Sequence, residues 1–144
     1  MKARSNASEK FSREDFSFFE TLRVRYAEID AQSIVFNAHY LTYFDVAITE
    51  YFRARTGKSY DELVADHGMD FHVQQSVIDY RSPARFDDLL QIGVRGAWRG
   101  ARVFWELAIF RGGELLCSGL LTYAAVDATN GAVKRISPAI AAAL

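Results

Sequence analysis

The sequence predicts an α+β fold in which one long helix is wrapped by a curved antiparallel sheet. Apolar residues recur at helical spacing over residues 39–57 and leave only a narrow polar stripe, so this helix must be largely enclosed. Long segments between residues 71 and 127 instead alternate as strands do. A chain of 144 residues, half of them hydrophobic, suffices for one core. We therefore expect a flexible tail over residues 1–15 and a single domain over residues 16–144.

Two helices are expected after a first strand over residues 16–26, which is rich in aromatic and β-branched residues. The long helix begins near His39 and ends at Gly57, a residue suited to the left-handed conformation that often closes helices. A shorter helix follows, with Ser59 as its N-cap and Gly68 as its stop. The polar stripe of the long helix consists of Thr42, Asp45, Thr49 and Arg53.

Four further strands are expected over residues 71–82, 88–98, 101–110 and 114–127. The turns between them are marked by the sequences "RGAR" and "GG", and "ATNG" then leads into a short final piece before Ser137. Simple alternation along the first of these strands places Phe71, Val73 and Val77 on one face and Ile78 and Tyr80 on the other.

Composition excludes several classes of function. Seventeen basic residues nearly balance eighteen acidic ones, which gives no general attraction to nucleic acid or to an anionic membrane. No apolar run approaches the roughly 18 residues of a membrane span, and the N-terminus does not read as a secretory signal. The histidines have no metal-like spacing, and no nucleophile elbow or phosphate-binding loop is present. We expect a soluble cytoplasmic protein without a bound metal, whose single cysteine, Cys117, is a buried apolar residue.

Three segments carry a resemblance to a known family: "VRYAEIDAQSIVFNAHYLTYFDVA" (24–47), "IDYRSPARFDDLLQI" (78–92) and "FRGGELLCSGLLTYAAVD" (110–127). In this order and spacing the chain resembles the hotdog-fold acyl-CoA thioesterases of the 4-hydroxybenzoyl-CoA thioesterase family, from about residue 18 to residue 138. The resemblance implies a hotdog fold and hydrolysis of an acyl-CoA to a free acid and coenzyme A. It implies no cofactor beyond the coenzyme A of the substrate. Sites of this family lie between subunits, so a homodimer or homotetramer is expected.

By this resemblance Asp30 falls on the catalytic aspartate, which acts as a nucleophile or activates water. Elementary physics agrees with the placement, because a carboxylate just before a helix lies near unpaired backbone N–H groups. Amides near Asn37 and Ala38 would hold the thioester oxygen as negative charge develops on it. The alternative is that Asp30 is only a turn or cap residue.

The expected substrate contacts divide into two groups. Phe36 and Tyr40 are candidates to line the acyl pocket. The phosphates of coenzyme A need cations, and the basic residues near the last strands offer Arg99, Arg102 and Arg135.

Three positions depart from the family pattern. Ser33 replaces a usual glycine and is strained by up to ~1 kcal/mol if φ is positive there. Asn37 replaces a frequent His or Tyr and cannot transfer a proton, and Ile48 replaces a frequent Arg. These departures keep a non-catalytic thioester-binding protein as an alternative. A hotdog hydratase or dehydratase is a weaker one, because that chemistry usually relies on a histidine with an acidic partner, and the corresponding histidine-bearing motif is missing near the helix.

Overall fold

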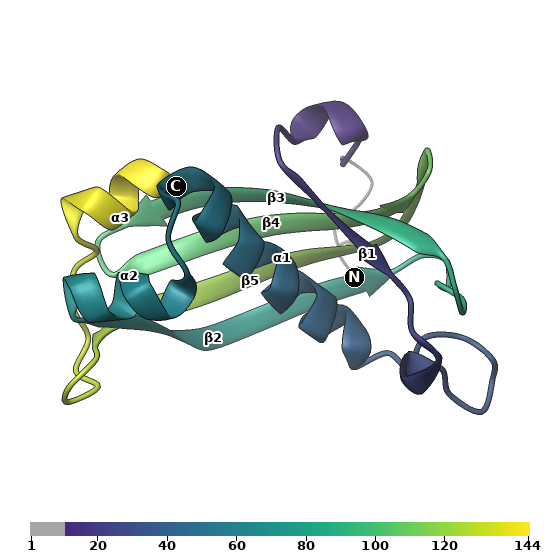
Figure 1. The fold of residues 1–144 in the computed structure, drawn as a ribbon, viewed down its shortest axis with the longest axis horizontal. Coiled ribbons are helices and arrows are strands. Elements are labelled where there is room, and N and C mark those ends of the chain that lie inside the picture. Colours follow the sequence, from purple (N-terminus) through teal and green to yellow (C-terminus); the bar gives the residue numbers. More distant parts are fainter. Residues whose placement is uncertain (1–10) are drawn as a thin grey trace, which may run out of the picture.

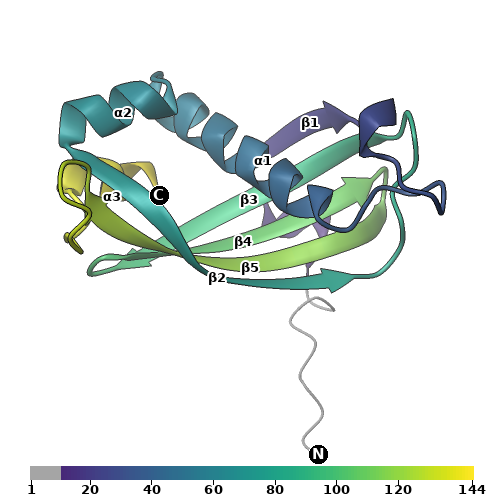
Figure 2. The same ribbon diagram turned by 90° about the horizontal axis from the view of Figure 1, so that it is seen from below.

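The computed structural model describes residues 11–144, which form one five-stranded antiparallel sheet with the strand order β1-β3-β4-β5-β2. The long helix α1 lies across the concave face of this sheet (Figures 1 and 2). This arrangement confirms the predicted α+β fold. Its elements are β1 (Phe19–Arg23), α1 (His39–Thr56), α2 (Tyr60–His67), β2 (Met69–Tyr80), β3 (Leu89–Arg99), β4 (Arg102–Arg111), β5 (Glu114–Asp127) and α3 (Pro138–Ala143).

The helix packs closely on the sheet because a glycine lies beneath it. Phe44 of α1 is fully buried, and a Cβ added at Gly119 of β5 would lie 2.6 Å from its Cε2 atom. Phe52 and Trp105 continue the same core with ring centroids 5.5 Å apart. Burying these aromatic faces between helix and sheet is the main driving force for this arrangement.

Helix termini follow the signals expected from the sequence. Gly57 ends α1 in the left-handed conformation with φ +72°, and Gly68 ends α2 with φ +61°. The Ser59 side chain caps α2 by accepting a hydrogen bond from the backbone N–H of Glu62 at 3.2 Å. These bounds confirm the two predicted helices.

Strand β2 forms one edge of the sheet and differs from the simple alternation expected for it. Its register against β5 shifts between Val73 and Gln75, where a β-bulge adds one residue. Val77 therefore pairs with Leu120 on the outer face, while Val73, Ile78 and Tyr80 share the face that carries α1. The predicted grouping of Val77 with Phe71 and Val73 was wrong because a bulge inverts the alternation beyond it.

A second, smaller core covers the outer face of the sheet. Phe16 packs over Gly93, where an added Cβ would lie 2.5 Å from its ring. Just before it, residues 13–15 form a 3-10 turn, and the Arg13 side chain donates to the Gly112 carbonyl at 3.1 Å. The first ten residues of the predicted tail lie outside the described residues, whereas residues 11–15 contact the sheet.

The chain departs from the predicted elements at both ends. Strand β1 is shorter than the expected 16–26, because the Val24 N–H donates to the Asp88 carbonyl at 2.9 Å and residues 26–28 then form a 3-10 turn. The final piece contains the helix α3, which the sequence analysis did not predict. Ser137 caps it by accepting from the Ile140 N–H at 3.4 Å, and Pro138 occupies the first turn.

Two further findings concern properties expected from composition. Within residues 11–144, no helix combines the length and apolar character needed to cross a membrane. Cys117 is fully buried, as predicted, and burial raises the pKa of its thiol to about 12.

Candidate active site

Asp30 lies in a cavity of about 320 Å³ at the N-terminal end of α1. The loop before α1 forms one side of the cavity, and the end of β2 with the residues after it forms the other. The lining consists of Asp30, Gln32, Ile34, Val35, Asn37, Tyr40, Tyr80, Arg81, Ser82 and Pro83.

A tight turn fixes the position of the Asp30 carboxylate. The Oδ1 atom accepts a hydrogen bond from the Gln32 N–H at 2.7 Å, and the backbone carbonyl of Asp30 accepts from the Ser33 N–H at 3.0 Å. Within residues 11–144, Oδ2 accepts no hydrogen bond. Ser33 has φ +63°, which confirms that this turn needs the conformation that a glycine adopts more easily. One carboxylate oxygen is thus held and the other is available.

The start of α1 offers unpaired backbone donors, and Asn37 lines the same cavity as Asp30. Ala38 is the N-cap residue, and no side chain caps the helix. The amides of Asn37 and Ala38 donate to no acceptor in residues 11–144, whereas the next amide, of His39, donates to the Phe36 carbonyl at 2.9 Å. On the opposite wall, the Tyr80 hydroxyl donates to the Asn37 carbonyl at 3.2 Å and fixes this segment. Such N–H groups stabilise negative charge.

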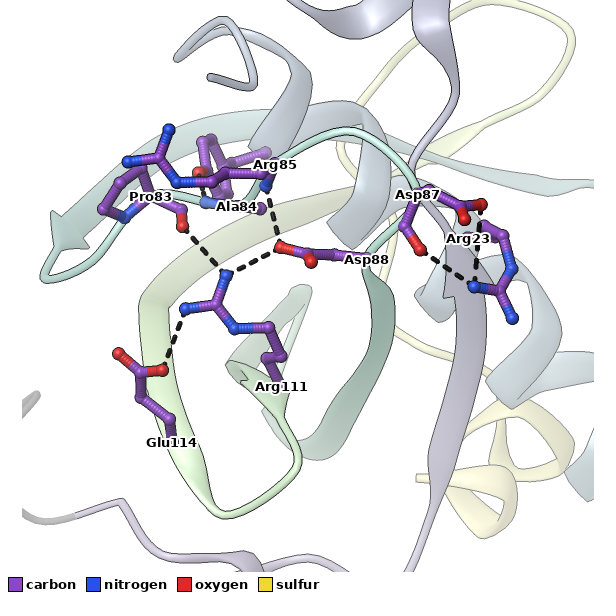
Figure 3. A network of polar contacts seen from close by, with 9 residues as sticks. Arg23, Pro83, Ala84, Arg85, Asp87, Asp88, Arg111 and Glu114 are labelled. Carbon is purple, nitrogen blue, oxygen red and sulfur yellow. Dashed lines mark hydrogen bonds and ion pairs between the residues drawn. The ribbon is translucent and has the colours of Figure 1, made fainter. Parts of the chain in front are cut away.

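The far wall of the cavity is held by a network around Arg111 (Figure 3). The half-buried guanidinium donates to the Asp88 carboxylate at 2.7 Å, to the Glu114 carboxylate at 2.9 Å and to the Pro83 carbonyl at 3.3 Å. Figure 3 shows these groups converging from the segment after β2 and from the β4–β5 turn. The segment that carries Ser82 and Pro83 is therefore tied to the sheet.

Ala84 couples this segment to the rest of the site. Its N–H donates to the Tyr40 hydroxyl at 3.0 Å, and its carbonyl accepts from the Val35 N–H at 2.9 Å. Nearby, Arg23 of β1 pairs with Asp87 and fixes the other end of the segment (Figure 3). Both walls of the cavity are thus connected, by one backbone hydrogen bond and by one bond to the Tyr40 hydroxyl.

Sequence comparisons agree with this architecture. Residues 24–144 match the family model described as the thioesterase-like superfamily. The chain belongs to this superfamily. It is 32% identical over 114 residues to the acyl-CoA thioesterase YbgC of Haemophilus influenzae, an alignment that covers 78% of this chain and 83% of that protein.

Solved structures show the same fold. A probable thioesterase from Bartonella henselae superposes with a TM-score of 0.77 at 28% identity, over 83% of this chain and 98% of that one. A DHNA-CoA thioesterase from Staphylococcus aureus superposes with a TM-score of 0.74 at 21% identity, over 81% and 78% of the two chains. The predicted hotdog fold, the thioesterase family and the activity class, thioester hydrolysis, are thereby confirmed.

In this thioesterase-like chain, the candidate residues near the helix gather at one place. Asp30, Asn37 and Tyr40 line the same cavity, with Ala38 directly beside it in the chain. Phe36 is 46% exposed and packs against the His39 ring rather than into the cavity. Their roles in binding and catalysis stay predictions.

The candidate arginines lie at the other end of the sheet. Arg99 and Arg102 face each other across the β3–β4 turn, and the Ile136 N–H donates to the Gly100 carbonyl at 3.0 Å, which brings Arg135 to the same turn. All three are exposed. Within a single chain this arginine cluster is separated from Asp30 by the length of the sheet (Figure 2).

Sequence reasoning missed the wall formed by Tyr80, Arg81, Ser82 and Pro83. These residues stand in "IDYRSPAR", a segment that carried the family resemblance, and this was the available signal. It also missed two cavities along α1 and β2, of about 450 and 240 Å³, which share Asp45, Val73 and Tyr123. Burial, followed by the proximity and hydrogen bond of Asp45, raises the pKa of Tyr123 in this region. A groove thus follows α1 away from Asp30.

Proposed function

We propose that the protein hydrolyses acyl-CoA thioesters and that Asp30 performs the central step. The observation that carries this proposal is one cavity lined both by Asp30, with a carboxylate oxygen that accepts no hydrogen bond from residues 11–144, and by Asn37, the first of the two residues with unpaired amides at the start of α1. A base or nucleophile and an oxyanion site are the two elements that acyl transfer from a thioester requires. Asn37 contributes its backbone and orients the substrate, because an amide side chain cannot transfer a proton.

The reaction follows from these groups. In one route Asp30 removes a proton from water as the water oxygen attacks the thioester carbon. In the other, the carboxylate attacks the carbon directly and forms an anhydride that water then hydrolyses. In both routes the carbonyl oxygen becomes negative beside the amides of Asn37 and Ala38. The tetrahedral intermediate then collapses as the C–S bond breaks, which gives the acid in the first route and the anhydride in the second. Coenzyme A leaves as a thiolate that takes up a proton, before water hydrolyses the anhydride of the second route.

Two copies of the chain are needed to complete the proposed site. Strand β2 pairs only with β5 within residues 11–144, so its other edge presents unpaired backbone groups along twelve residues. Exposed apolar residues lie along this region, including Val73 on β2 and Leu41 and Val46 on α1. A long apolar edge strand is a pairing surface. A second copy, joined across β2 by a twofold axis, would cover it.

This pairing supports a role for the arginine cluster. Antiparallel pairing of two β2 strands sets the start of one against the end of the other, so the cluster of the second copy comes to the end that holds Asp30 of the first. Arg99 and Arg102 are directly opposite each other, an unfavourable arrangement for like charges. No ion pair joins either of them, or Arg135, to another of residues 11–144. The phosphates of coenzyme A would neutralise this cluster.

We also place the enzyme in the cytoplasm. Its one cysteine is unpaired and buried, as suits a reducing compartment. A tetramer would be built from two of the proposed dimers.

The test measures thiol release and binding together for short, long and aromatic acyl-CoAs. The proposal expects turnover of at least one of them, with release of one thiol per acid formed. Tight binding without any thiol release would instead identify a thioester-binding protein. Addition of water to an unsaturated acyl-CoA without thiol release would identify a hydratase, although none of the three histidines lines the cavity.

A further inference from the structure

Glu28 is the only charged side chain among residues 11–144 that is buried, at 3% exposure. It lies two residues before Asp30, in the 3-10 turn Tyr26–Glu28. Burying a carboxylate costs several kcal/mol unless it is well paired, and an apolar residue often replaces a buried ion pair without loss of stability. Stability alone is therefore a weak explanation for a charge at this position.

The Glu28 carboxylate is fully occupied by hydrogen-bond donors. Oε1 accepts from the Arg25 backbone N–H at 2.8 Å and from the Tyr43 hydroxyl at 2.9 Å. Oε2 accepts from Nε and Nη2 of Arg25 at 3.1 and 2.7 Å. Burial raises the pKa of Glu28, but the hydrogen bonds from Arg25 and Tyr43 outweigh it and lower the pKa overall. With both oxygens engaged, Glu28 is unsuited to act as a base itself.

Its bonds instead join the two parts of the candidate site. Tyr43 is fully buried and lies in the first two turns of α1, shortly after Asn37 and Ala38, whose amides are unpaired. The backbone carbonyl of Glu28 accepts from the Phe36 N–H at 2.9 Å, so one residue contacts both the helix and the far end of the loop. That loop contains the strained Ser33, and its shape therefore depends on the bonds that close it.

We propose that Glu28 is a positioning residue, which holds the Asp30 carboxylate at a fixed place relative to the N-terminal amides of α1 through its bond to Tyr43. This inference rests on the proposed function, since it assigns Asp30 and these amides to one reaction. Orientation of reacting groups contributes strongly to rate, and a displacement of about 1 Å costs up to about a hundredfold. Glu28 acts on the reaction only through the groups it holds.

The test compares two substitutions on the same helix. Tyr43→Phe removes only the hydroxyl that bonds to Glu28. Tyr51→Phe is the matched control, because Tyr51 is also buried on α1 and its hydroxyl donates to the Leu144 carbonyl at 3.2 Å, away from the loop. Tyr43→Phe is expected to lower kcat about ten- to hundredfold with little change in KM. Tyr51→Phe should leave kcat unchanged. Glu28→Gln should resemble Tyr43→Phe, with a larger fall in kcat.

Two more measurements separate positioning from general destabilisation. In an Asp30→Asn background, Tyr43→Phe should have little further effect on the residual rate, because it acts through Asp30. Hydrogen exchange of the Asp30 and Phe36 amides should be faster in Tyr43→Phe than in Tyr51→Phe, and this readout needs no turnover. Equal exchange in the two variants, or an unchanged kcat in Tyr43→Phe, would overturn the inference. Failure of the wild-type protein to hydrolyse any acyl-CoA would refute the proposed function, and the exchange comparison would still decide whether Glu28 holds the loop.

Discussion

Replacing Gly119 with alanine tests the close approach of α1 to the sheet. The new Cβ would lie 2.6 Å from Cε2 and 3.1 Å from Cζ of Phe44, and 3.3 Å from Cδ1 of Leu121. Real Cβ atoms are essentially never found at the first of these distances, so either the Phe44 ring or the helix must move. Because Phe44 is fully buried, the ring has little space to turn.

Overpacking of this kind typically costs about 1–3 kcal/mol of unfolding free energy. For a chain of this size, the midpoint of thermal unfolding should fall by roughly 3–10 °C. Gly113→Ala is the matched control, because nothing lies within 4 Å of a Cβ there and φ is not positive. Its unfolding free energy should change by less than about 0.5 kcal/mol.

The assay is urea denaturation of the wild-type protein and both variants at one protein concentration, since self-association changes apparent stability. The unfolding free energy of Gly113→Ala should be close to that of the wild type, and that of Gly119→Ala should be lower than both. If Gly119→Ala is within about 0.5 kcal/mol of the wild type, the helix is not packed on the sheet as described.

Three other predictions concern the loop, acid stability and the arginine cluster. Ser33→Gly should raise the unfolding free energy by up to ~1 kcal/mol in urea denaturation, because glycine adopts the positive φ of +63° without strain. A lower unfolding free energy would show that Ser33 is not strained. The pKa of Glu28 is lowered in the folded protein, so the ionised carboxylate stabilises the fold above pH 4.5, its ordinary pKa, and this stabilisation is lost as pH falls through the folded pKa. The loss of unfolding free energy caused by Glu28→Gln should therefore become smaller below about pH 4.5. A loss that stays constant with pH would refute this. Arg102→Gln should raise KM about fivefold for an acyl-CoA but not for an acyl thioester of N-acetylcysteamine, which has no phosphates; equal effects on the two substrates would exclude a phosphate contact.

Local signals made the helices and the last strands predictable. Gly57 and Gly68 mark the ends of α1 and α2, because glycine readily adopts the left-handed conformation that closes a helix. The bounds of β5, Glu114–Asp127, follow from the two glycines of the preceding turn and from the strand-like alternation of side chains after them. The bulge in β2 was not predictable, because it depends on pairing with β5 and leaves no clear mark in the residues near Val73. Helix α3 is short, and the apolar and small residues after Ser137 show no distinct period.

The candidate site was predictable where one segment of the chain builds it. Asp30, Asn37 and Tyr40 lie within eleven positions of one another, and the family resemblance covers them. The bond between Glu28 and Tyr43 was not predictable, because the two residues are fifteen positions apart and become neighbours only when α1 folds back over the 3-10 turn. Likewise, Arg111 reaches Pro83 across 28 residues of sequence. Contacts of this kind arise from tertiary structure rather than from local pattern.

The most direct test of the central claim is the rate of thiol release by Asp30→Asn with the best acyl-CoA substrate. Asp66→Asn is the matched control, because Asp66 is exposed on α2 and pairs with Lys58. Loss of a general base or nucleophile should lower kcat about 10²–10⁴-fold while substrate binding is retained, and Asp66→Asn should keep the wild-type rate. An Asp30→Asn protein that releases thiol at the wild-type rate would contradict the assignment of Asp30 as the catalytic residue.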